Sequence, residues 1–164
     1  MNDCILLGLD LGVHIGIACL RKKELITFET THFIDVFKTP YQYLGVEDYI
    51  PYRSKGFRIS GDGILTVKQL GIIEFDFKNV ITMSRSKICA MITGMSNAKK
   101  SQVRQRLSQV LEGLVTLKGR TDHEIDAIAT VLTLGIILGQ KGLIIKGMSH
   151  WTPVFQTILE KKGL

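Results

Sequence analysis

The segment CILLGLDLGVHIGIACL, residues 4–20, contains two apolar runs on either side of a glycine-containing turn. The runs at 4–9 and 15–20 are rich in aliphatic and β-branched residues, and we interpret them as strands. Gly12 and Gly16 punctuate the chain between them. The segment therefore predicts a β-hairpin that opens an α/β sheet.

The remaining chain has no internal repeat and no linker that would divide it. A third strand is expected over residues 24–31, and Pro40 disfavours a long helix in 33–44. The Gly-rich, basic segment 51–63 is expected to be an exposed loop. Later elements are expected to be strands over 44–50 and 79–83 and helices over 64–75, 96–114, 121–138 and 154–161. This order favours the α/β class.

The composition is that of an ordinary globular protein. The 164 residues suit one domain, with 45% hydrophobic and 22% charged residues. The formal net charge of +6 favours a polyanionic partner, since basic residues near phosphates release counterions. A solubilising positive surface explains the same charge, so the charge alone leaves both readings open.

Cysteine usage and the N-terminus bear on localisation. Cys4, Cys19 and Cys89 are far apart and show neither zinc nor disulfide spacing, so we interpret them as buried thiols in a reducing compartment. The apolar start of the chain is interrupted by Asp10, and we therefore expect no signal peptide. These features predict a cytoplasmic protein with no membrane partner.

Asp10 is the first candidate for chemistry. It lies within an apolar run between Gly8 and Gly12, although aspartate is a poor strand residue. A carboxylate held by a rigid strand is suited to a hard divalent cation. The alternative is an aspartate that starts a turn by bonding the following backbone. The same short motif opens the phosphate loops of Hsp70-like and sugar-kinase ATPases, but 164 residues do not supply their second lobe, and no nucleotide cofactor is expected.

Further acids follow at Glu47-Asp48 and in the helix that begins near residue 121. Adjacent strand residues face opposite ways, so only one acid of the first pair can share a site with Asp10. His123 and Asp126 are three residues apart and lie on one helix face. Acids at a helix start commonly complement the helix dipole, but an Asp126 carboxylate in a half-buried turn needs a metal or another cation.

Together these residues describe a metal site. Asp10, Glu47 and the pair His123 and Asp126 place three carboxylates and an imidazole on separate elements of one domain. Converging carboxylates repel one another unless divalent cations neutralise them. Such a set is typical of a two-metal site for phosphodiester cleavage.

Four sequence blocks resemble the RuvC family of Holliday junction resolvases, most closely its short phage-type members. The blocks are LGLDLG at 7–12, VEDYI at 46–50, AKKSQV at 98–103 and HEIDAIA at 123–129. Their order and approximate spacing are similar to those of the family over about residues 5–138. A phage-encoded member would act in the cytoplasm of its bacterial host.

The resemblance implies an RNase H-like fold, which is an α/β fold with a mixed five-stranded sheet flanked by helices. Residues 1–140 would form this nuclease domain, and 141–164 a C-terminal extension packed on it. The implied activity is cleavage of four-way junctions and other branched DNA, leaving 5′-phosphate ends. A homodimer would cut opposed strands, and the helix 64–75 is the expected interface.

The resemblance also assigns roles to individual residues. Two Mg²⁺ (or Mn²⁺) ions per active site would be bound by Asp10, Glu47, His123 and Asp126, with His123 alternatively an acid–base group. Lys100 would lie near the scissile phosphate as a further catalytic residue. The residues expected to contact DNA are Arg53, Lys55, Arg58, Arg85, Lys87, Lys99, Lys100 and Arg104.

Three departures from the family pattern and two alternatives accompany this interpretation. The chain has no room for a helix between strands three and four, Ile50 stands where an aromatic wedge is frequent, and Cys89 stands where a second lysine is expected. If the segment around Cys89 is a strand, Lys87 points the same way. The alternatives are a RuvX-type RNA-processing nuclease of the same fold and a catalytically inactive module that binds branched DNA.

Overall fold

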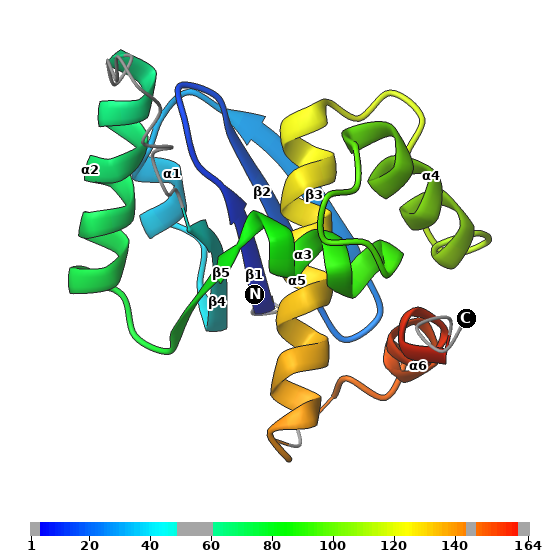
Figure 1. Cartoon of the computed structure of the whole chain (residues 1–164). Coiled ribbons are helices and arrows are strands. Elements are labelled where there is room, and N and C mark those ends of the chain that lie inside the picture. Colours follow the sequence, from blue (N-terminus) through cyan, green and yellow to red (C-terminus); the bar gives the residue numbers. More distant parts are fainter. Residues whose placement is uncertain (1–3, 49–60, 144–146, 161–164) are drawn as a thin grey trace.

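The computed structural model describes residues 4–48, 61–143 and 147–160. Within them, five strands form one mixed sheet in the order β3-β2-β1-β4-β5 (Figure 1). The pairs β1–β2 and β2–β3 are antiparallel, and the pairs β1–β4 and β4–β5 are parallel. The strands are β1 (Cys4–Asp10), β2 (Ile15–Leu20), β3 (Leu25–Thr30), β4 (Tyr41–Asp48) and β5 (Val80–Ser84).

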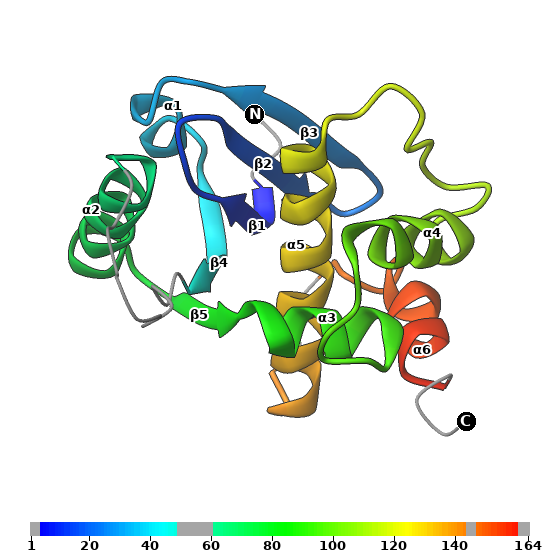
Figure 2. The ribbon, with the colours of Figure 1, turned by 45° about the horizontal axis from the view of Figure 1, so that its top comes forward.

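Helices cover both faces of this sheet, so the molecule has three layers (Figures 1 and 2). They are α1 (Ile34–Phe37), α2 (Gly61–Asp76), α3 (Arg85–Thr93), α4 (Lys100–Val110), α5 (Asp122–Gln140) and α6 (Thr152–Glu160). On one face α1 and α2 bury residues such as Val36 and Ile73. On the other face α5 lies across β1 and β2, and α3, α4 and α6 pack around it. The expected α/β class and mixed five-stranded sheet are confirmed.

The β1 strand divides its side chains between the two cores. Leu6 belongs to the core under α5, whereas Leu7 and Leu9 belong to the core under α2. This alternation follows from the two-residue period of a strand. Even-numbered positions of β1 therefore face α5, and Asp10 at the end of the strand shares that face.

Two glycines allow α5 to lie directly on the hairpin. An added Cβ at Gly8 would lie 2.5 Å from the carbonyl oxygen of Ala127 and 2.6 Å from the backbone nitrogen of Val131. A Cβ at Gly16 would overlap the His123 carbonyl group. The absence of side chains at these two positions brings the helix that carries His123 onto the strand that ends at Asp10.

Several element boundaries differ from the expected ones. The α3 helix was not expected, and the segment around Cys89 is helical, so the condition that it is a strand is not met. Ser84 caps this helix by accepting a hydrogen bond from the Lys87 backbone N–H, and Gly94 ends it in a left-handed conformation with φ 82°. Nine residues give too few turns for a clear periodic pattern.

Other differences concern helix starts. Residues 61–63 belong to α2, so the expected loop 51–63 is wrong at its end, and residues 51–60 lie outside the described ranges. The α4 helix begins at Lys100 rather than 96, because the Gln102 side chain accepts the hydrogen bond of the Lys99 backbone N–H. Only the four-residue α1 lies between β3 and β4, in agreement with the expected lack of room for a helix.

The C-terminal segment joins the core under α5. Trp151 is 1% exposed, and its indole N–H donates to the Arg21 carbonyl oxygen at 2.7 Å. Val154 and Ile158 bury the inner face of α6 in the same core. Trp151 is thus a packing residue.

Two further observations concern cysteines and membranes. Cys89 is a free, buried thiol, but Cys19 is disulfide-bonded, so the expectation of free thiols is wrong for Cys19. Separation along the sequence does not decide whether two sulfurs meet in the fold. No helix in the described part of the chain combines the length and apolar character needed to span a bilayer.

Candidate active site

Asp10 and Glu47 lie side by side at the carboxyl ends of two neighbouring parallel strands. Leu9 of β1 pairs with Val46 of β4, so the two acids follow at the same level. A Cβ added at Gly45 would lie 3.2 Å from the Leu134 Cβ of α5, so the side chain of Glu47, two residues later on the strand, faces α5 as Asp10 does. Val46 is buried in the opposite core, and Asp48 shares its direction. Of the adjacent acids, Glu47 is the one that shares a site with Asp10.

The α5 helix brings Asp126 to the same place. Its start is fixed by a capping box, in which Thr121 Oγ1 accepts from the Glu124 backbone N–H and Glu124 accepts from the Thr121 backbone N–H at 2.9 Å. Asp126 lies one turn further, with its side chain 6% exposed. The predicted start of this helix near residue 121 is confirmed, and Glu124 has a structural role as part of the cap.

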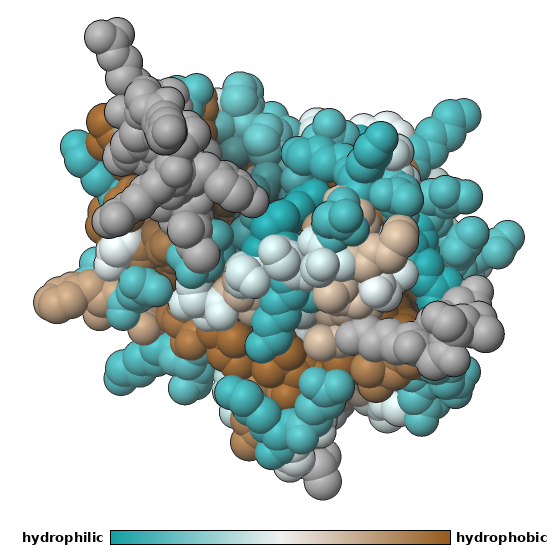
Figure 3. Space-filling model, in the orientation of Figure 1, coloured by the Kyte–Doolittle hydropathy of each residue, from teal (hydrophilic) through white to brown (hydrophobic). Residues whose placement is uncertain are grey.

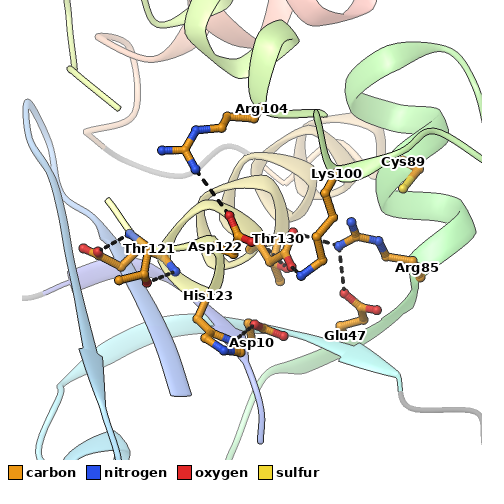
Figure 4. A network of polar contacts seen from close by, with 12 residues as sticks. Asp10, Glu47, Arg85, Cys89, Lys100, Arg104, Thr121, Asp122, His123 and Thr130 are labelled. Atoms are coloured by element: carbon orange, nitrogen blue, oxygen red, sulfur yellow. Dashed lines mark hydrogen bonds and ion pairs between the residues drawn. The ribbon is translucent and has the colours of Figure 1, made fainter. Parts of the chain in front are cut away.

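Two cations bind the buried Asp126 carboxylate, Lys100 and Arg85. Figure 4 shows these two side chains close to Glu47. Lys100 Nζ lies 2.9 Å from Oδ2, and Arg85 Nη1 lies 2.9 Å from Oδ1. The same Arg85 nitrogen lies 3.5 Å from Glu47 Oε2. Arg85 thus links the acid of β4 to the acid of α5, and Lys100 extends from the start of α4 to the other side of Asp126.

An imidazole pairs with Asp10. His123 Nδ1 lies 2.7 Å from Asp10 Oδ2, and the His123 ring is stacked on that of His14 with centroids 5.8 Å apart. His14 in turn lies 2.8 Å from Glu29 on β3. The β1–β2 turn therefore positions His123. This contact was not predicted, since His14 lies in no recognisable motif.

The three carboxylates lie within electrostatic reach of one another. The pKa of Glu47 is raised to about 7, mainly by burial; the charge of Arg85 opposes this rise, and the charges of Asp10 and Asp126 add to it. Burial also raises the pKa of Asp10, against the hydrogen bond from His123 and together with the charge of Asp126. The site concentrates negative charge that burial makes costly.

Glu47→Gln is expected to stabilise the protein at pH 8 and to have little effect at pH 4. The folded protein binds a proton at Glu47 up to about pH 7, whereas the unfolded chain releases it near 4.5. Stability of the wild type therefore falls as pH rises through this window, by up to about 3 kcal/mol at about 1.4 kcal/mol per pKa unit. Urea unfolding in EDTA at both pH values measures it, with the exposed Glu112→Gln as control. The expectation would be refuted if the free energies of unfolding of wild type and Glu47→Gln differed by the same amount at pH 4 and at pH 8.

The side chains that meet in the site are of the chemical types that bind hard divalent cations. Carboxylate oxygens and an imidazole are ligands used by Mg²⁺ and Mn²⁺. Among the described residues, no three side chains of His, Cys, Asp or Glu are arranged so that they could hold one ion. Arg85, Lys100 and His123 instead contact the carboxylate oxygens. Loading the site with two ions therefore requires these contacts to rearrange.

The residues expected to contact DNA have different surroundings. Arg53, Lys55 and Arg58 lie outside the described residues. Lys87 and Lys99 are exposed. Arg104 lines a pocket of about 270 Å³ with Lys100 and Asp126, but its guanidinium also donates to the carbonyl oxygens of Leu117 and Arg120.

The role of Arg85 was missed from the sequence, which assigned it to DNA contact alone. In a helix, residues four apart share a face, so Arg85 and Cys89 lie on the same side of α3. Cys89 is buried, and Arg85 reaches the acids from the turn before it. Lys87 lies two residues after Arg85 and therefore on another side of α3, where it is exposed. The basic group near the position of the expected second lysine is therefore Arg85.

The sheet order, the mixed pairing and α5 across the first hairpin define an RNase H-like fold. Two solved structures share it, the RuvC protein of Thermus thermophilus (TM-score 0.53) and T. thermophilus RuvC in complex with Holliday junction substrate (TM-score 0.55). Each is 16% identical to this chain, and the match covers 84% of this chain and 96% of the other. No protein-family model and no curated protein matches the sequence. The likeness establishes a RuvC-like fold.

Proposed function

We propose that this chain is a structure-selective endonuclease that cleaves four-way junctions and other branched DNA, leaving 5′-phosphate ends. The observation that carries the proposal is the meeting of Asp10, Glu47 and Asp126 on one side of a RuvC-like sheet, with Lys100 against Asp126. Three acids beside two cations, Lys100 and Arg85, suit a reaction on a phosphodiester, in which metal ions and cations share the charge of the phosphate.

Two Mg²⁺ or Mn²⁺ ions would be held by Asp10, Glu47, His123 and Asp126. When bound, such ions activate water and stabilise the leaving 3′ oxygen. The chain itself supplies positioning. Asp10 and Glu47 stand on rigid neighbouring strands, and Asp126 on a capped helix that two glycines hold against the sheet. His14 stacks on His123 and orients its ring.

Lys100 is placed to bind the scissile phosphate. Its ammonium group contacts Asp126, yet its side chain is 59% exposed. Because the side chain extends from solvent to the buried acid, its ammonium group can leave Asp126 and bind a phosphate oxygen without any movement of α4. Lys99 and Lys87 add exposed positive charge nearby, in agreement with a polyanionic substrate.

A homodimer is part of the proposal, with α2 as the interface. The helix exposes apolar side chains that a monomer leaves in water, and Phe75 is 89% exposed. Figure 3 shows apolar surface along the edge of the molecule that α2 forms. Exposed apolar patches of this kind mark protein interfaces. The exposed apolar residues of α2 are Ile64, Leu65, Val67, Ile72 and Phe75, and Phe75 is by far the most exposed of them.

Phe75→Glu is expected to separate the dimer into monomers, raising its dissociation constant at least about 100-fold, because a buried aromatic contact is replaced by a charge. Light scattering coupled to gel filtration over a range of concentrations measures this. Met95→Glu, at an exposed apolar position outside α2, is the control and should leave the dimer intact. If the wild type were monomeric at all concentrations, the proposal that α2 is a dimer interface would be wrong.

The test of the proposed function is cleavage of a synthetic four-way junction, compared with a linear duplex of equal length, in Mg²⁺ or Mn²⁺. Paired nicks near the branch point, absent for Asp10→Asn and in EDTA, are the expected result. Cutting of structured RNA with both DNAs intact would favour a RuvX-type nuclease instead. Binding of the junction without any cutting would identify an inactive binding module.

A further inference from the structure

Arg85 is held rigidly at the centre of the acidic site. It is the first residue of α3, directly after the Ser84 cap, and four residues before the buried Cys89 that anchors the helix to the core. Its side chain is 31% exposed. The guanidinium therefore reaches Glu47 and Asp126 from a fixed backbone.

The contacts of Arg85 use oxygens that a divalent ion would need. Its Nη1 lies 2.9 Å from Asp126 Oδ1 and 3.5 Å from Glu47 Oε2, and Lys100 binds the other oxygen of Asp126. A guanidinium remains charged at every accessible pH, so this cation is permanent. Asp10 differs, because its ion-pair partner among the described residues is the His123 imidazole alone.

We propose that Arg85 acts as an internal cation that competes with one of the two divalent ions, so that each protomer without DNA binds a single ion. This inference rests on the proposed function and adds an order of assembly to it. The ion associated with Asp10 binds first. The oxygens of Glu47 and Asp126 become available to a second ion only when Arg85 leaves them.

A phosphate group of DNA is the partner suited to draw Arg85 away. Arginine binds phosphate in a two-pronged geometry with strong, charge-assisted hydrogen bonds. When the guanidinium turns to a phosphate, Glu47 and Asp126 lose their shared cation and gain affinity for a metal ion. By linkage, DNA and the second ion then strengthen each other's binding.

The test is the number of Mn²⁺ ions bound per protomer in the absence of DNA, measured by isothermal titration calorimetry. Wild type is expected to bind about one ion. Arg85→Met, and Arg85→Gln, which keeps a hydrogen-bond donor without the charge, are expected to bind about two. Lys141→Met, at an exposed lysine directly after the end of α5, is the control and should behave as wild type.

Thermal unfolding gives a second readout. Removing Arg85 leaves two neighbouring carboxylates without their shared cation. Arg85→Met and Arg85→Gln should therefore have lower melting temperatures than wild type in EDTA, and Mn²⁺ should restore them. Two ions on wild type without DNA, or one ion on all variants, would overturn the inference and leave the nuclease proposal intact. If neither wild type nor any variant bound Mn²⁺, both the inference about Arg85 and the proposed nuclease function would be overturned.

Discussion

Asp126→Asn is expected to abolish cleavage, by at least about 1,000-fold, while junction binding stays intact or tightens. The carboxylate would hold a metal ion, and an interaction made in the transition state that is worth about 4 kcal/mol corresponds to such a factor. Asparagine also lowers the repulsion toward phosphate and frees Lys100 and Arg85, both now 2.9 Å from Asp126, to contact DNA. Single-turnover cleavage and gel shifts of the junction measure the two effects.

The control for this variant is Asp122→Asn, four residues earlier on α5. Asp122 is exposed and pairs with Arg104 at 3.3 Å. The same chemical change there should leave cleavage within about twofold. Loss of binding together with activity in Asp126→Asn, in a protein that melts as wild type does, would contradict a metal-ligand role and point to a structural one.

Gly8→Ala is expected to destabilise the protein by about 3 kcal/mol or more. The added methyl group would lie 2.5 Å from the Ala127 carbonyl oxygen and 2.7 Å from the Val131 Cβ, both in α5. Neither contact ends on a flexible side chain, so the helix itself must move away from β1. Urea unfolding measures the loss.

The matched control is Gly71→Ala on α2. This glycine is exposed and an added Cβ there meets nothing within 4 Å. Alanine should stabilise the helix by about 0.5–1 kcal/mol. A displacement of α5 also moves Asp126 relative to Asp10, and about 1 Å can cost about 100-fold in rate, so the folded fraction of Gly8→Ala should cut slowly. Equal stability changes for the two variants would show that the β1–α5 contact is not tight.

The sequence predicted best where a local pattern decides the structure. The β1–β2 hairpin follows from two apolar runs and a turn, and the start of α5 follows from its capping residues. The choice of Glu47 over Asp48 came from family resemblance, and strand alternation in the structure agrees with it. These features depend on residues close together in the chain or on a regular period.

The sequence failed where contacts between distant segments decide. The bridging position of Arg85 depends on the end of β4, the start of α3 and the second turn of α5 meeting at one point. No spacing in the sequence reports such a meeting. The α3 helix was missed for a related reason, because its short pattern is stabilised by packing on α4 and α5 rather than by strong periodicity.

The distribution of the acids over β1, β4 and α5 has a consequence for the life of the chain in the cell. Asp10 and Glu47 are synthesised early, but Asp126 leaves the ribosome only after the whole sheet has been made. A nascent or truncated chain that lacks α5 carries two acids and neither His123 nor Asp126. Under the proposed function, a complete active site therefore forms only once α5 has been synthesised and packed on the sheet.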